Sequence, residues 1–307
     1  MRIGIIGYGF VGSAVAAAHD RNMLMINDPG KFEEWQQYTV EQIKENCGWI
    51  YVCLPTAQKE DGGCDTSILD DMLEQLKDYE GFVISKSTAP PKWYKDIFDN
   101  CGMNKKYKFK FIHMPEFLTA KNAIHDYMHP KIIVIGGNPI HTSVITTHVI
   151  NSDMTYKSKA KIVRTDIGSA AAMKYYANSW LATKVVYNNQ FAKWCESQGV
   201  VWNDVTEILA QDNRLGDTHY NVPGENGDVG YAGACFPKDI AAILKVADDN
   251  GVDMSLLKSQ IEINDAMREV QRVQREEEAA RIKAFPQRRR RDELPPYNPN
   301  ANNRRRR

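Results

Sequence analysis

One cysteine of the sequence, in the segment GYAGACFPKD, has surroundings typical of a nucleophile. Cys235 stands two residues before Pro237, a favoured first residue of a helix, and the segment PKDIAAILKVA predicts that helix. The positive end of a helix favours a thiolate, and Lys238 adds a cation. Gly230 and Gly233 allow strained loop angles and close approach of a bulky substrate. The alternative is a buried cysteine beside an ordinary helix cap.

Two hydrogen-bond donors occur one helical turn apart in the segment MKYYANSW. Lys174 and Asn178 are four residues apart, so a helix places them on one face. Together they could donate to a developing oxyanion; the alternative is an exposed polar face. Glu116 follows a predicted strand and could be a general base or cap a turn. The segment STAPP (87–91) ends another strand, at the sheet edge where such folds bind ligands.

The start of the sequence carries a dinucleotide-binding pattern. Gly7, Gly9 and Gly12 have GxGxxG spacing between a predicted strand and an alanine-rich helix, and Asp28 ends the next strand 21 residues after Gly7. These glycines permit a tight turn, approach of a pyrophosphate and close packing of helix on strand. A carboxylate at Asp28 would bind ribose hydroxyls and repel a 2′-phosphate, which predicts NAD, although Lys31 nearby could offset this preference. The alternative is a glycine turn without a ligand.

Apolar segments alternate with helical segments over roughly the first 155 residues. The strands show little polar alternation, which is typical of a sheet covered on both faces. We predict an α/β fold with a Rossmann-like, doubly wound parallel sheet, and an NAD-binding domain over residues 1–160. Residues 165–198 predict a long helix. We expect residues 161–275 to form this central helix and an all-helical substrate and dimerisation domain, followed at 276–307 by a helix end and a disordered Arg-rich tail.

The composition is that of a globular protein, with 43% hydrophobic and 25% charged residues. No apolar run is long enough to span a bilayer and no secretory leader is visible, so we expect a cytoplasmic protein without a membrane partner. The six cysteines lack metal-site spacing, so we predict reduced thiols and no metal. The last 43 residues carry 13 Lys and Arg against 7 Asp and Glu. A solvated basic tail is favoured over a nucleic-acid contact.

These motifs together identify a known family. The chain resembles the UDP-glucose/GDP-mannose dehydrogenases over residues 1 to about 270, in the motifs GYGFVG, LPT, STAPP, PEFL, KYYAN, DNRLGDTHYN and GYAGACFPKD, which keep the family's order. The last motif is highly specific. The Lys-x-x-x-Asn helix also resembles the β-hydroxyacid dehydrogenases, which have no cysteine nucleophile, so Cys235 distinguishes the two families.

The resemblance implies an NAD-dependent, four-electron oxidation of a nucleotide sugar, with UDP-glucose the leading substrate, from the C6 alcohol to the carboxylate. One NAD would take a hydride to give an aldehyde. Cys235 would attack the aldehyde to form a thiohemiacetal, and a second NAD would oxidise this to a thioester that water hydrolyses.

The resemblance also implies roles for particular residues. Lys174 and Asn178 would supply oxyanion donors and Glu116 the acid/base, while Asp239 and Thr88 would position and polarise the water. The implied cofactor-binding residues are Gly7, Tyr8, Gly9, Phe10, Val11, Gly12, Asp28, Pro55, Thr56, Thr88 and Lys238. The implied substrate-binding residues are Phe117, Leu118, Lys174, Asn178, Arg214, Tyr220, Asn221, Gly230 and Gly233. Arg214 would reach the neighbouring site across a homodimer interface formed by the long helix.

Some positions depart from the family pattern. Met114 replaces an asparagine before PEFL, Gln190 a glutamate, and Ala232 a glycine. Family members continue into a third, Rossmann-like domain that contacts the substrate nucleotide, and the segment KAFPQRRRR predicts that this domain is missing. Two other functions stay open: a two-electron hydroxyacid-type dehydrogenase using Lys174 as base, and a non-catalytic NAD-binding subunit whose third domain comes from a partner.

Overall fold

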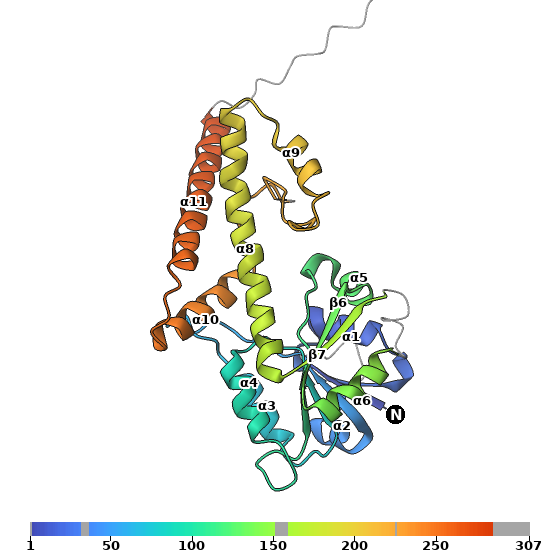
Figure 1. Cartoon of the computed structure of the whole chain (residues 1–307). Helices are drawn as coiled ribbons and strands as arrows, with labels where there is room; N and C mark the ends of the chain where they lie inside the picture. Colours follow the sequence, from blue (N-terminus) through green and yellow to red (C-terminus); the bar gives the residue numbers. More distant parts are fainter. Residues whose placement is uncertain (1, 32–36, 151–158, 225, 285–307) are drawn as a thin grey trace, which may run out of the picture.

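The computed structural model describes residues 2–31, 37–150, 159–224 and 226–284, and shows a sheet-bearing part joined to a helical part by one long helix (Figure 1). The strands are β1 (Arg2–Ile6), β2 (Leu24–Asn27), β3 (Cys47–Val52), β4 (Phe82–Ser85), β5 (Lys110–His113), β6 (Ile132–Gly137) and β7 (Lys161–Thr165). They form one sheet in the order β2-β1-β3-β4-β5-β6-β7. The predicted fold class is therefore confirmed.

The sheet is only partly parallel, which corrects the prediction in detail. Strands β1 to β5 are parallel, whereas β6 runs antiparallel to β5 and β7 pairs in parallel with β6. The connection from β5 to β6 contains only η3 (Ala120–Asn122) and α5 (Ala123–Met128). A helix as short as α5 spans about 9 Å, too little to carry the chain back across the sheet, so the next strand returns reversed.

The predicted domain boundary after residue 160 falls just before β7. Because β7 pairs with β6 along Lys161 to Thr165, the sheet extends five residues beyond that boundary. Residues 276–284, which were predicted as a helix end, belong to one continuous helix, Ser255–Ala284. The predicted disordered tail at 285–307 lies outside the described residues.

Helices cover both faces of the sheet. One face packs against α1 (Phe10–Ala17), α5 and α6 (Pro139–Ile150). The other packs against α2 (Val40–Asn46), α3 (Ser67–Gln75), α4 (Pro91–Asp99) and the start of α8 (Ile167–Ser197). Short 3-10 turns at η1 (Arg21–Met23) and η2 (Pro29–Lys31) flank β2. This covering explains the continuous apolar runs of β1, β3, β4 and β5, whose residues are largely buried on both faces.

Helix α8 connects the sheet-bearing part of the chain to the helical part. Asp166 caps it by accepting a hydrogen bond from the Ser169 N–H (2.9 Å). Its first turns pack on the sheet, and its later residues Ala182 and Val186 enter a separate core of the helical part. That part contains α9 (Trp202–Leu209), α10 (Phe236–Asp249) and α11 (Ser255–Ala284), and α11 lies alongside α8 (Figure 1). Within the described residues, no helix is long and apolar enough to cross a membrane.

The carboxyl end of β4 is held by a buried hydrogen-bond network. The Tyr94 hydroxyl of α4 donates to the Ser87 carbonyl (2.6 Å) and bonds to Ser85 Oγ (2.7 Å). Ser87 Oγ donates in turn to the carbonyl of Leu54, after β3 (2.7 Å). Because an unpaired buried carbonyl is costly, Tyr94 fixes the strand end that carries the STAPP segment.

We expect Tyr94→Phe to lower the free energy of unfolding by about 1–3 kcal/mol, because the Ser87 carbonyl loses its buried donor. Urea unfolding followed by circular dichroism measures this. The control Ser259→Ala removes an exposed hydroxyl on α11 and should not lower the free energy of unfolding by more than about 0.5 kcal/mol. Equal stabilities of the two variants would contradict the role given to Tyr94.

Candidate active site

The glycine turn between β1 and α1 has the shape needed to cradle a diphosphate. Gly7 has φ +89°, and a Cβ there would lie 2.5 Å from the Cys53 carbonyl oxygen. A Cβ at Gly12 would lie 1.9 Å from the Gly7 carbonyl oxygen, so helix and strand approach too closely for a side chain. At Gly9 a Cβ would meet nothing within 4 Å. The open space at Gly9 faces the N-terminus of α1, where anions are favoured.

Asp28 follows β2 beside this turn. Its carboxylate accepts hydrogen bonds from the backbone N–H groups of Tyr8 and Gly30 (2.8 Å for Gly30). A carboxylate offers about four acceptor positions, so Asp28 retains acceptors for ribose hydroxyls. The residues of this region therefore fit the adenosine and diphosphate groups of a dinucleotide. The side chain of Lys31 lies outside the described residues.

One cavity of about 660 Å³ runs along the carboxyl ends of β1 to β5 and reaches the start of α10. It is lined both by the glycine turn and by Cys235. The other predicted residues that line it are Phe10, Val11, Asp28, Pro55, Thr56, Thr88, Glu116, Lys174, Lys238 and Asp239. The residues predicted to bind the cofactor and the predicted nucleophile therefore line the same cavity.

Lys174 on α8 and Glu116 after β5 form a buried ion pair. Lys174 Nζ lies 3.2 Å from Glu116 Oε1 and donates to the Glu116 carbonyl at 2.6 Å. Glu116 Oε2 accepts from the Leu118 N–H (2.8 Å), and the Phe117 ring centroid lies 5.5 Å from Lys174 Nζ. An ammonium has three donors, so one N–H of Lys174 remains for a ligand.

Asn178, Lys238 and Asp239 form a second polar group. Asn178 Nδ2 donates to Asp239 Oδ2 (2.6 Å), and Lys238 Nζ lies 2.5 Å from Asp239 Oδ1. Asp239 is 1% exposed and lies in the first turn of α10, where the helix dipole favours a carboxylate. Lys174 and Asn178 are both buried, so the exposed-face alternative is wrong for them.

Cys235 is the exposed N-cap residue of α10, which places its thiol at the mouth of the cavity. The burial alternative for this cysteine is therefore wrong. Both loop glycines before it have positive φ, +67° at Gly230 and +83° at Gly233. The loop thus uses backbone angles that favour glycine, as the sequence predicted.

Of the nine residues predicted to bind substrate, Lys174 alone lines this cavity. The lining does not include Phe117, Leu118, Asn178, Arg214, Tyr220, Asn221, Gly230 and Gly233, nor the predicted cofactor residues Tyr8 and Gly12. Arg214 is exposed and forms an ion pair with Asp212 (2.5 Å). Tyr220 is buried, its carbonyl accepts from Trp202 Nε1 (2.9 Å), and Lys184 Nζ lies 3.8 Å from its ring centroid. Asn221 is exposed beside it. Within one chain, Arg214, Tyr220 and Asn221 therefore lie outside the cavity lining, although the rings of His219 and Phe236, which adjoin Tyr220 and Cys235 in sequence, have centroids 6.1 Å apart.

Lys86 lines the cavity at the carboxyl end of β4, and the sequence analysis missed it. It is 5% exposed, and its Nζ lies 5.0 Å from the Tyr127 ring centroid. Burial lowers the pKa of Lys86 to about 8, against opposing effects of Cys53 and Glu116. The signal was a lysine directly after the apolar strand in FVISKST.

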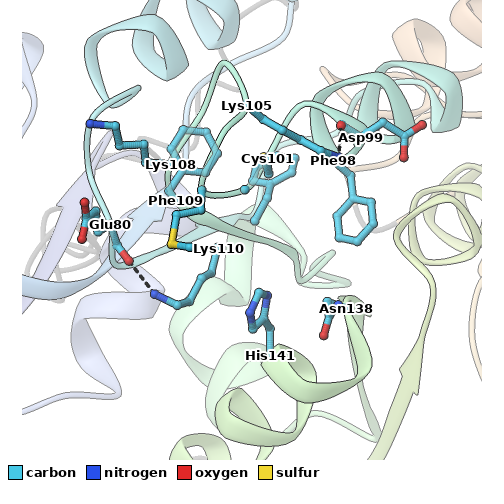
Figure 2. A pocket seen from close by; sticks show the side chains of 13 residues that line it. Glu80, Phe98, Asp99, Cys101, Lys105, Lys108, Phe109, Lys110, Asn138 and His141 are labelled. Atoms are coloured by element: carbon cyan, nitrogen blue, oxygen red, sulfur yellow. Dashed lines mark hydrogen bonds between the residues drawn. The ribbon is translucent and has the colours of Figure 1, made fainter.

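A second cavity, of about 630 Å³, lies around the amino end of β5 (Figure 2). Its lysines are already bonded to the chain: Lys110 Nζ donates to the Glu80 carbonyl and Lys105 Nζ to the Asp99 carbonyl, both at 2.6 Å. No predicted site residue lines it. Among the described residues, no group of three or more His, Cys, Asp or Glu side chains could hold a metal ion.

Solved structures share this fold. A UDP-glucose dehydrogenase from Pyrobaculum islandicum superposes with a TM-score of 0.69 at 19% identity, covering 86% of this chain and 68% of that one. A GDP-mannose dehydrogenase from Pseudomonas aeruginosa gives 0.59 at 21% identity, covering 87% and 69%. At these identities the likeness concerns the fold.

Curated relatives are similar in sequence. The UDP-glucose 6-dehydrogenases of Rickettsia felis and Rickettsia bellii are 29% and 30% identical over 223 and 227 residues, which is 72% and 73% of this chain. The chain spans about half the length of these relatives, 48% and 50%. UDP-glucose 6-dehydrogenase AglM of Haloferax volcanii is 26% identical over 308 residues, covering 88% of this chain and 70% of that protein.

Two domain models of a single family match the chain in consecutive segments. The NAD binding domain matches residues 30–152, after the glycine turn and through β6, and the central domain matches residues 168–266, from α8 into α11. Both halves that line the cavity are therefore assigned together, and the chain belongs to the UDP-glucose/GDP-mannose dehydrogenase family.

Proposed function

We propose that this chain is an NAD-dependent nucleotide-sugar 6-dehydrogenase, with UDP-glucose as the leading substrate. One observation carries the proposal: a single cavity joins a dinucleotide turn to an exposed cysteine at a helix N-terminus. The family match and the names of the Rickettsia relatives support the substrate class.

The cofactor would lie along the carboxyl ends of the strands. Gly7, Gly9 and the start of α1 would hold the diphosphate of NAD, and Asp28 would accept the ribose hydroxyls. NAD, when bound, supplies the oxidant for both two-electron steps. The chain's own residues must then hold the sugar, donate to its oxyanion and activate water.

Cys235 would hold the sugar between the two oxidations. Its sulfur adds to the C6 carbonyl of the aldehyde, which forms a C–S bond and a thiohemiacetal. Oxidation of this adduct gives a thioester, and addition of water breaks the C–S bond and releases the carboxylate and the thiol. Exposure of Cys235 at the cavity mouth supports this role, because the sulfur must meet a carbon of the substrate.

Lys174 and Asn178 would donate to the oxyanion in both tetrahedral adducts. Each retains one N–H beyond those bonded to Glu116 and Asp239. These donors are already oriented, so they need little reorganisation when charge develops. Glu116, which lines the cavity, would take the proton from the hydrolytic water. Thr88 and Asp239 would hold that water.

The exposed side of α8 supports a homodimer formed by this helix. Tyr176, Trp180, Tyr187 and Trp194 are 69%, 55%, 60% and 55% exposed, and their spacing of four, seven and seven residues places them on one face. Such a stripe of large aromatic side chains is typical of an interface. In the dimer, Arg214 would reach the partner's substrate site, which agrees with its separation from the cavity of its own chain.

Wild-type protein should form two NADH per UDP-glucose consumed, measured by absorbance and by sugar-nucleotide chromatography. Cys235→Ser should lose formation of the acid by at least about a thousandfold, because an alkoxide is a poorer leaving group than a thiolate. Cys101→Ser, a thiol at the second cavity, serves as the matched control and should keep normal turnover.

One NADH per sugar would contradict the four-electron reaction and favour a two-electron dehydrogenase. Full acid formation by Cys235→Ser would contradict the role of Cys235 as the nucleophile. Binding of NAD without NADH formation from any UDP- or GDP-sugar would favour a non-catalytic subunit.

Glu116→Gln should slow turnover by about 100-fold or more, because water loses its proton acceptor. An acyl group should then accumulate on Cys235, detectable by intact-mass spectrometry after an acid quench. Glu80→Gln, at the second cavity, is the control. A slowed variant whose Cys235 stays unmodified would place Glu116 in another step.

Replacing Trp180 and Tyr187 together by glutamate should convert the dimer to a monomer, because two charges would be buried in the interface. Light scattering coupled to size-exclusion chromatography measures the mass. Ile140→Glu, which also changes an exposed apolar side chain (73%) but on α6, should leave the mass unchanged. A monomeric wild-type protein would rule out this interface.

A further inference from the structure

Lys86 brings an uncompensated charge into the cavity. The other cavity lysines are matched, Lys174 by Glu116 at 3.2 Å and Lys238 by Asp239 at 2.5 Å. Lys86 is as deeply buried as Lys174, yet within the described residues its ammonium has no hydrogen-bond or ion-pair partner, only the Tyr127 ring at 5.0 Å. A buried charge without a partner is costly, so its position requires an explanation from function.

The position of Lys86 relative to the cofactor follows from the cavity. The diphosphate would lie at β1 and α1, and the reacting sugar at Cys235. A dinucleotide that connects the two must pass the carboxyl ends of β3 and β4. Lys86 lines the cavity on that path, so the nicotinamide half of the cofactor enters the space that Lys86 faces.

The charge of the nicotinamide ring depends on its redox state: the oxidised ring is a cation and the reduced ring is neutral. We propose that Lys86 makes the cavity bind NADH in preference to NAD and thereby favours both oxidations of the sugar. This inference rests on the proposed function. A nearby ammonium at low dielectric repels the oxidised ring and leaves the reduced ring unaffected.

The preference should depend on pH. The titratable groups that face Lys86 are Cys53 after β3, His113 at the end of β5, Glu116 after β5, Tyr127 from α5 and Lys174 from α8. Burial lowers the pKa of His113 to about 3, so this ring stays neutral. Burial raises the pKa of Cys53 to about 12 and that of Tyr127 well above its usual value, so both stay neutral. The pKa of Lys86, about 8, means that its charge is present near pH 7 and lost above pH 8.

The test compares dissociation constants for NAD and NADH, from NADH fluorescence and competition, at about pH 7 and about pH 9.5. Wild-type protein should bind NADH more tightly at pH 7 by a factor on the order of tenfold, and this ratio should fall at pH 9.5. Lys86→Gln should remove most of the ratio at both pH values, whereas Lys86→Arg should keep it at both. Lys92→Gln, an exposed lysine paired with Asp96 on α4, should behave as wild type.

If Lys86 had only a structural role, its replacement would weaken the binding of both cofactors equally and leave the ratio of their dissociation constants unchanged. An unchanged ratio in Lys86→Gln therefore overturns this inference while the proposed function stands. If wild-type protein binds neither cofactor, both fall. Should Lys86→Gln fail to fold by circular dichroism, the wild-type pH series decides, and a ratio independent of pH overturns the inference.

Discussion

The buried ion pair between Lys174 and Glu116 is the contact on which the arrangement of the site depends. Their side chains are 6% and 12% exposed, so removal from water offsets much of their attraction. Removing one partner is a different matter, because a lone buried charge costs about 3–5 kcal/mol. Helix α8 therefore cannot slide against β5 without a large loss. The pair fixes a geometry more than it stabilises a fold.

From Lys174 the constraint extends to the nucleophile. Asn178 lies one turn further along α8 and bonds Asp239, which is itself in the first turn of α10. The Asp239 N–H donates to the Cys235 carbonyl (3.0 Å), so the N-cap residue follows the position of Asp239. Sheet, long helix and cysteine are thus connected through the carboxylates of Glu116 and Asp239.

Local patterns predicted the parts of this system that depend on neighbours in sequence. The glycine turn, the shared face of Lys174 and Asn178, and the helix after Cys235 all follow from spacing over a few residues. The partners of Lys174 and Asn178 lie 58 and 61 residues away, and no periodicity reveals them. The reversal of β6 was hidden for the same reason, because an apolar run such as KIIVIGG predicts a strand but carries no direction. The sequence analysis missed Lys86 because a lysine is normally a surface residue.

The proposed chemistry explains why two lysines of the cavity are paired with carboxylates and a third is not. Two successive oxidations require that the cofactor leave the cavity once while the sugar stays, and a C–S bond to an exposed Cys235 allows that exchange. The matched pairs of Lys174 and Lys238 keep their donors oriented throughout without adding net charge. Among the described lysines that line the cavity, Lys86 is the one without a carboxylate partner. The proposed preference for the neutral, reduced ring then favours hydride transfer in both oxidations, while the bond to Cys235 keeps the sugar in place during the exchange.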